Sequence, residues 1–252
     1  MQAPLYIISD NHFNSNNSND EINRREKLFQ VLNKIKEKGE GTLIIGGDFF
    51  DYWFEYDEVI PAGYESILKA LKELHMSGIE IHYVLGNHDY WDFGYLQNHI
   101  GVIIHSSDLS IELNDKKILL THGDGLLKND YGYRFMKKII RSKLFIKLFK
   151  LFPSKVTISL ANRLSNTSHY YNHHPYDKHT KMIKKDITEF AQKKWKENFD
   201  MVLVGHYHQE GTITENSKSL TFLGDWLSKY TVTVIKDSKL WQGDWKKFLE
   251  LS

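Results

Sequence analysis

The chain has 252 residues, no cysteine, and 33 basic against 32 acidic side chains. This length is enough for one domain with a sizeable core, and the absence of cysteine excludes disulfides and thiolate zinc sites. No uninterrupted apolar run reaches the roughly 18 residues of a membrane-spanning helix, and a strand is predicted from Leu5 with no basic and apolar leader before it. We therefore expect neither a transmembrane segment nor a secretory signal.

Predicted strands and helices alternate along the first half of the chain. Strands at 5–10, 42–47 and 79–85 are separated by helices at 20–38 and 61–77. Asp20 and Glu21 favour the N-terminus of the first helix, and Pro61 and Gly78 mark the start and the end of the second. Further strands are predicted at 102–105, 109–113, 117–121 and 201–205, followed by antiparallel strands at 211–215, 219–223, 230–235 and 239–242 with turns at Asn216, Asp225 and Asp237-Ser238.

Five short motifs of aspartate, asparagine and histidine follow apolar runs in a fixed order. They are Asp10-Asn11-His12, Gly47-Asp48-Phe49-Phe50-Asp51, Gly86-Asn87-His88-Asp89, His122-Gly123-Asp124 and Gly205-His206-Tyr207-His208. Such residues lie in the loops beyond the carboxyl ends of strands, where open α/β sheets bind ligands. One motif alone is a weak signal, because a single histidine is more often a packed or surface side chain. Five in order indicate one shared site.

The side chains of these motifs suit a two-metal site that hydrolyses a phosphate ester. Two divalent cations about 3.5–4 Å apart neutralise the anionic phosphate, lower the pKa of a water molecule and hold the attacking and leaving oxygens. Such a site needs oxygen ligands and neutral imidazoles, with one carboxylate shared by both cations. A set of aspartate, histidine and asparagine ligands suits Mn, Fe or Zn without choosing among them.

The order of the motifs resembles the calcineurin-like metallophosphoesterase superfamily over roughly residues 5–235. The resemblance implies an α/β fold, a four-layer α/β/β/α sandwich of two mixed sheets, and an enzyme with two divalent metal ions. One metal would be held by Asp10, His12, Asp48 and His208, and the other by Asp48, Asn87, His122 and His206. His88 would act as the catalytic acid on the leaving oxygen, with Asp89 orienting it. Asp51 and Asp124 would fix the tautomers of ligands, or else cap their own loops.

A segment without acidic residues separates the fourth motif from the fifth. Between Tyr131 and Tyr176 the chain carries nine lysines and arginines, which leaves 24 basic against 32 acidic residues elsewhere. Large apolar residues recur there at steps of three and four, from Phe135 to Phe152. A helix with wide apolar and basic faces can lie in a membrane interface or cover an acyl-binding groove. The alternative is an ordinary amphipathic helix that packs its apolar face on the core.

Together with Asp130-Tyr131-Gly132-Tyr133, Phe135 and Leu223-Gly224-Asp225-Trp226, this segment resembles the UDP-2,3-diacylglucosamine pyrophosphatases of lipid A biosynthesis. The resemblance implies a single domain over 1–252 with a basic, apolar helical lid insertion at 128–176. It implies that the UDP-linked lipid is cleaved to UMP and 2,3-diacylglucosamine 1-phosphate. Mn is then the first choice of metal, and the expected location is cytoplasmic, peripherally on the inner membrane.

The same resemblance implies substrate contacts from Asn87, Arg163 and Ser165, and the cluster from His169 to His174 is a further candidate for the substrate pocket. Two departures leave the substrate open. The best-known members of that family have arginine where this chain has His88, and they commonly have an apolar residue at the position of Asn11.

The chain is therefore either a divergent member of the lipid branch or a soluble metallophosphatase acting on nucleotides or phosphoproteins. A metal-binding scaffold without activity is disfavoured, because every ligand position and His88 are intact. Nucleic acid is not expected as a partner, because the basic residues alternate with large aliphatic side chains instead of stacking aromatic ones.

Overall fold

The computed structural model describes residues 1–55, 60–151 and 176–251. The chain divides into two compact units: unit 1 comprises Met1–Gly123 and Lys194–Ser252, and unit 2 comprises Asp124–Lys193. The insertion predicted at 128–176 falls within unit 2, and its role as a lid remains a prediction. In the ranges that the structure describes, no helix combines the length and apolar character needed to cross a membrane.

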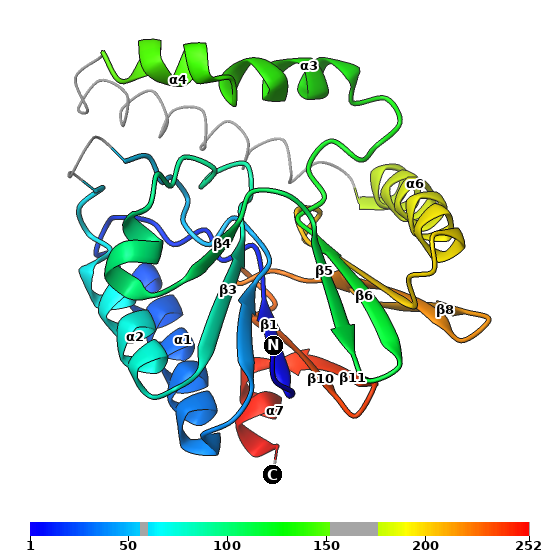
Figure 1. Ribbon diagram of the computed structural model, residues 1–252, viewed down its shortest axis with the longest axis horizontal. Coiled ribbons are helices and arrows are strands. Elements are labelled where there is room, and N and C mark those ends of the chain that lie inside the picture. The colour runs from blue at the N-terminus through cyan, green and yellow to red at the C-terminus, as the bar shows by residue number, and fades with distance from the viewer. Residues whose placement is uncertain (56–59, 152–175, 252) are drawn as a thin grey trace. The chain divides into compact units, whose positions relative to one another are not determined.

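Unit 1 is built on two mixed β-sheets, which confirms the predicted fold class (Figure 1). The first sheet has the order β11-β10-β1-β2-β3-β4, and its strands are β1 (Leu5–Ile8), β2 (Thr42–Ile45), β3 (Glu80–Val84), β4 (Ile103–His105), β10 (Thr231–Lys236) and β11 (Lys239–Asp244). The second has the order β5-β6-β7-β9-β8, and its strands are β5 (Leu109–Leu113), β6 (Lys116–Thr121), β7 (Met201–Val204), β8 (Glu210–Glu215) and β9 (Lys218–Leu223). All eleven strands were predicted, with ends that agree to within two residues.

The central strands are mostly apolar because the first sheet is covered on both faces. Tyr6 and Ile8 belong to a core between this sheet and the helices α1 (Asn19–Lys38), α2 (Glu65–Met76) and α7 (Trp245–Glu250). Leu5 and Ile7 belong to a second core, which lies between the two sheets. Figure 1 shows α1 and α2 side by side along the outer face of the first sheet. Parallel strands buried in this way read as continuous hydrophobic runs.

The ends of the helices show where local sequence decides structure. Ser18 caps α1 by accepting a hydrogen bond from the backbone N–H of Glu21, and Gly39, with φ of 66°, ends the helix as predicted. The predicted start of α2 at Pro61 is wrong, because Gly63 adopts a left-handed φ of 92° and the helix begins only at Glu65. Three helices were not predicted, namely η1 (Leu96–Ile100), α6 (Tyr176–Lys196) and α7. The first and the last have only one or two turns, which carry too little periodicity.

Unit 2 contains α3 (Tyr131–Ile140), α4 (Lys143–Phe149) and most of α6 (Tyr176–Lys196). Ser142 separates α3 from α4 and caps the latter by accepting a hydrogen bond from the N–H of Phe145. Neither α3 nor α4 buries any residue fully, and Leu144 and Leu148 are 69% and 51% exposed. The role of α3 and α4 as a lid remains a prediction, as does the alternative of an ordinary amphipathic helix that packs its apolar face on a core.

Candidate metal centre

The five motifs lie at the carboxyl ends of five parallel strands. The first three follow β1, β2 and β3, which are neighbours in the first sheet, and the last two follow β6 and β7, which are neighbours in the second. Because parallel neighbours end at the same edge of a sheet, the topology gathers each set of motifs at one edge.

Side chains of the motifs form three groups whose potential ligand atoms lie within 4.8 Å of one another, and two of these groups combine residues from both edges. The groups are Asp10, His12 and His208; Asp48, His122 and His206; and His12, Asp48 and His88. The first two fall within the two ligand sets that the sequence predicts. The third adds His88, so the geometry allows this residue to be a ligand as well as an acid.

In the first group, Asp10 holds its carboxylate in place through several hydrogen bonds. The Ser9 hydroxyl donates to Oδ2 at 2.7 Å, and the backbone N–H of His206 lies 2.9 Å from both carboxylate oxygens. His208 Nε2 lies 3.6 Å from Asp10 Oδ1 and 3.3 Å from His12 Nε2. Two ring nitrogens and a carboxylate oxygen thus converge on one point, as the ligands of a cation do.

In the second group, His122 stands between a carbonyl and two other oxygens. Its Nδ1 lies 3.0 Å from the Gly46 carbonyl, while Nε2 lies 3.3 Å from Asp48 Oδ2 and 3.1 Å from Asn87 Oδ1. If Nδ1 donates to the carbonyl, the lone pair of Nε2 faces two oxygens, and a cation among the three atoms satisfies them all. A hydrogen bond of this kind on the second ring nitrogen fixes the tautomer of metal-bound histidines.

Glycines beside the ligands provide the space that these contacts need. A Cβ atom on Gly86 would overlap the Asp48 carboxylate, and one on Gly47 would overlap the His122 ring. Gly47 also has a left-handed φ of 100°. The glycine next to the polar residue in these motifs is therefore a requirement of close approach.

The ligand loops have an unusual backbone. Five non-glycine residues of the motifs have left-handed φ angles between 46° and 64°, namely Asp10, His12, Asp48, His206 and His208. Such conformations are disfavoured for residues with a side chain and persist only where surrounding contacts enforce them, which happens most often at functional sites.

Burial and neighbouring charges shift the pKa values of these groups in different directions. Burial raises the pKa of Asp10 to about 7 and, with the neighbouring His12, lowers the pKa of His208 to about 3. Burial also lowers the pKa of His12. Although burial alone would raise it, the pKa of Asp48 is well below its usual value because His122 and His88 lie beside the carboxylate. The neutral imidazoles of His12 and His208 are suited to bind a divalent cation beside the Asp10 and Asp48 carboxylates.

His88 is held by Asp51 instead of by Asp89. Its Nδ1 lies 2.8 Å from the Asp51 carbonyl, and its backbone N–H donates to Asp48 Oδ1 at 2.9 Å. Asp89, which was expected to orient His88, accepts hydrogen bonds from the N–H groups of Phe49 and Gly86 and from the Tyr83 hydroxyl. Asp89 therefore ties the loop of the third motif to the loop of the second.

Asp124 belongs to unit 2, where it accepts a hydrogen bond from the Tyr133 hydroxyl at 2.9 Å and pairs with Lys137 at 2.7 Å and Arg141 at 3.3 Å. The predicted substrate contacts Arg163 and Ser165 and the cluster 169–174 lie outside the described residues.

One cluster of charged residues beside the site was not predicted. Glu21, Arg24 and Arg25 of α1 lie close to the first motif, and Glu21 pairs with both arginines. A signal was present in the sequence: Glu21 and Arg25 continue, at steps of three and four, the buried stripe of Leu28, Leu32 and Ile35.

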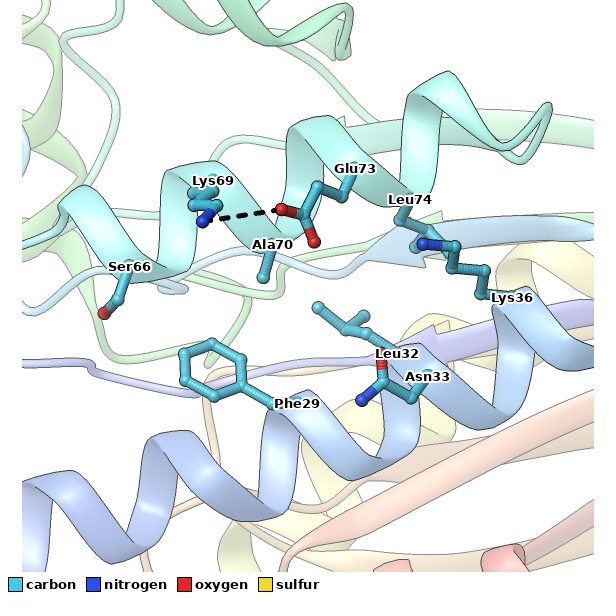
Figure 2. Close-up of a pocket in the computed structure, with 9 residues that line it drawn as sticks. All are labelled: Phe29, Leu32, Asn33, Lys36, Ser66, Lys69, Ala70, Glu73 and Leu74. Atoms are coloured by element: carbon cyan, nitrogen blue, oxygen red, sulfur yellow. Dashed lines mark ion pairs between the residues drawn. The ribbon is translucent and has the colours of Figure 1, made fainter.

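A separate pocket lies between α1 and α2, away from the motifs. Figure 2 shows nine residues that line it, among them Phe29, Leu32 and Ala70 at its apolar part and an exposed Lys69–Glu73 ion pair. None of the motif residues lines this pocket.

Comparison with known proteins places this arrangement in a family. The model of the calcineurin-like phosphoesterase family matches residues 3–210. A protein of Porphyromonas gingivalis named UDP-2,3-diacylglucosamine hydrolase is 28% identical over 243 residues, which cover 90% of this chain and 92% of the relative. A protein of the same name from Neisseria meningitidis is 27% identical over 236 residues, covering 90% and 91%. Among solved structures, an archaeal phosphodiesterase aligns with a TM-score of 0.45 and 15% identity, covering 95% of this chain and 98% of that one.

The ionisation of His208 predicts how the stability of the metal-free protein depends on pH. Burial lowers its pKa to about 3 from the ordinary 6.5, so between these values the unfolded chain binds a proton at this residue that the folded protein does not. The free energy of unfolding therefore falls as the pH is lowered through this window. We expect His208→Asn to lose less stability than the parent between pH 6.5 and pH 4 in urea unfolding with a chelator. The exposed His99→Asn serves as the control, and equal slopes for His208→Asn and the parent would contradict the assignment.

Proposed function

The chain belongs to the calcineurin-like phosphoesterase family, and on this premise we propose that it hydrolyses the pyrophosphate of UDP-2,3-diacylglucosamine with two divalent metal ions. The products are UMP and 2,3-diacylglucosamine 1-phosphate. The observation that carries the reaction class is the pair of ligand groups with Asp48 beside both. The substrate is supported by relatives named UDP-2,3-diacylglucosamine hydrolase that align over nine-tenths of both chains.

We assign one metal to Asp10, His12, Asp48 and His208, and the other to Asp48, Asn87, His122 and His206. When bound, the two ions supply the positive charge that an anionic phosphate requires and activate a water molecule for attack. The oxygen and imidazole donors suit Mn, with Fe and Zn as alternatives. Asp48 is the shared ligand because its carboxylate lies near both His12 and His122.

His88 supplies the proton to the leaving oxygen in this proposal. Burial opposes protonation of the ring, but Asp48 and Asp51 raise its pKa above the ordinary value. The proton on Nδ1 is directed to the Asp51 carbonyl, which leaves Nε2 for proton transfer. A histidine that is protonated near neutral pH is suited to act as a general acid.

The acylated part of the substrate is assigned to unit 2. Large apolar side chains of α3 and α4 are exposed, and exposed lysines at 138, 143 and 147 accompany them. Lysines beside exposed apolar residues suit an anionic lipid surface, which supports a peripheral location on the inner membrane. Lys137 and Arg141 are already paired with Asp124, so they contribute less to this attraction than a count of charges suggests.

A soluble metallophosphatase acting on nucleotides or phosphoproteins is the second candidate. The observation in its favour is His88, which stands where the best-known members of the lipid branch have arginine. The metal assignment is the same for both candidates, so only the choice of substrate separates them.

If His88 is the general acid, His88→Ala lowers kcat by roughly 10²–10⁴-fold while both metals stay bound. The measurement combines steady-state kinetics with metal analysis of the purified variant. The exposed His99→Ala is the matched control and should keep parental kinetics. Loss of metal in step with loss of rate would instead make His88 a ligand, as the third group of side chains allows.

With Mn added, the purified protein should release UMP from UDP-2,3-diacylglucosamine, identified by mass, and should turn over phosphomonoesters and cyclic nucleotides poorly. Leu144→Ser and Leu148→Ser should each lower turnover of the acylated substrate at least about tenfold, because burying a leucine against lipid is worth roughly 1.5–3 kcal/mol. Turnover of the deacylated analogue should stay within about twofold of the parent.

Met76→Ser is the matched control, since Met76 is 75% exposed on α2 of unit 1. Unchanged turnover of the acylated substrate in both leucine variants would remove the role of α4. No turnover of UDP-2,3-diacylglucosamine by the parent would leave the soluble phosphatase as the better account.

A further inference from the structure

The backbone of the first motif has its polar groups satisfied from two sides. On one side, the N–H groups of Asp10, His12 and Phe13 donate to the carbonyls of Gly47, Asp48 and Phe49, at 2.9 to 3.0 Å. On the other side, the Asp10 carbonyl accepts a hydrogen bond from the N–H of Trp226 at 3.1 Å. The next two carbonyls, of Asn11 and His12, accept hydrogen bonds from a third part of the chain.

Arg24 of α1 is the donor. Its Nη2 donates to the carbonyls of Asn11 and His12, the latter at 3.1 Å, and its Nε lies 3.4 Å from the Trp226 carbonyl. The indole N–H of Trp226 donates back to the Arg24 carbonyl at 3.1 Å. One guanidinium thus joins the loop of the first motif to the loop after β9, and its fixed fork reaches carbonyls that a single ammonium could not span.

The position of Arg24 is itself fixed. Glu21 Oε2 pairs with Nη1 at 2.7 Å, and the guanidinium lies over the Phe13 ring at 5.4 Å from its centroid. Glu21 also pairs with Arg25 through its other oxygen at 3.0 Å. Arg25, however, donates to the carbonyls of Asn14 and Asn16, beyond the ligand residues. Two adjacent arginines therefore share one carboxylate, but only Arg24 contacts the backbone of a ligand.

The contacts of Arg24 bear on a strained part of the chain. Asp10 and His12 both have left-handed φ angles, of 52° and 46°, so their conformation depends on surrounding contacts. Without Arg24, two carbonyls of a buried loop lose their donor, and the loop is free to relax toward an ordinary conformation. Such a change would move the His12 ring relative to His208 and Asp10.

We propose that Arg24 is a positioning residue that clamps the carbonyls of Asn11 and His12 and thereby sets the affinity of the first metal. The inference rests on the proposed function, since it takes the metal assigned to Asp10, His12, Asp48 and His208 as the group whose binding Arg24 supports. Arg24 touches neither metal nor substrate in this account.

The test is calorimetric titration of Mn into the metal-free full-length protein, with the parent, Arg24→Lys, Arg24→Gln and the matched control Arg25→Lys. We expect the Arg24 variants to bind one of two Mn ions about 10–100-fold more weakly, the usual effect of removing a partner of a ligand. Arg25→Lys should stay within about threefold of the parent at both sites. The kcat of Arg24→Lys should recover toward the parental value at high Mn concentration.

The other possible results contradict either this inference or the metal assignment of the proposed function. Parental Mn affinity in Arg24→Lys and Arg24→Gln overturns the inference. Equal losses in the Arg24 and Arg25 variants, in step with lower thermal stability of the metal-free proteins, make the role merely structural and also overturn it. If Arg24→Gln does not fold, Arg24→Lys decides alone. A parent that binds fewer than two Mn ions refutes the metal assignment of the proposed function, which is a separate failure.

Discussion

A buried negative charge on Asp48 is the constraint on which the site depends. Asp48 is 1% exposed, and a charge in that position requires compensation by hydrogen bonds and positive partners. The backbone N–H of His88 and the rings of His12 and His122 surround it. Gly86 has no side chain because the carboxylate fills that space. Two divalent cations on either side of this carboxylate would complete the compensation that the protein begins.

The order of the strands in the two sheets brings together the side chains that surround Asp48. Two sheets, each with parallel strands at its centre, place the carboxyl ends of five strands where their loops share one site. The helix α1 adds to this arrangement from outside the sheets, because Arg24 reaches from the helix to the carbonyls of the first motif. Rigid, buried strands thus carry the ligands, while unit 2 presents exposed apolar side chains on α3 and α4.

Much of the fold was predictable because buried segments have recognisable patterns of apolar residues in the sequence. Strands buried on both faces appear as apolar runs, and polar residues at their ends mark the site. The start of α2 was not predictable from Pro61, because Gly63 is left-handed and lies so close to the Ser15 backbone that a Cβ atom there would overlap it. Arg24 was not identified because charged residues on a helix are normally exposed, and its partners are loop carbonyls that only the folded chain provides. Asp89 was expected to orient its neighbour His88, but the tight loop directs the two side chains to different partners, and Asp51 makes that contact from 37 residues away.

The most direct test of this account is the location of Mn in crystals of the metal-loaded protein, by anomalous diffraction. The account predicts two Mn peaks about 3.5–4 Å apart with the Asp48 carboxylate contacting both. It also predicts that crystals of Asp48→Asn lose at least one peak, while those of the exposed variant Asp108→Asn keep both. A single peak in the parent, or two peaks of which Asp48 contacts only one, would contradict the central claim.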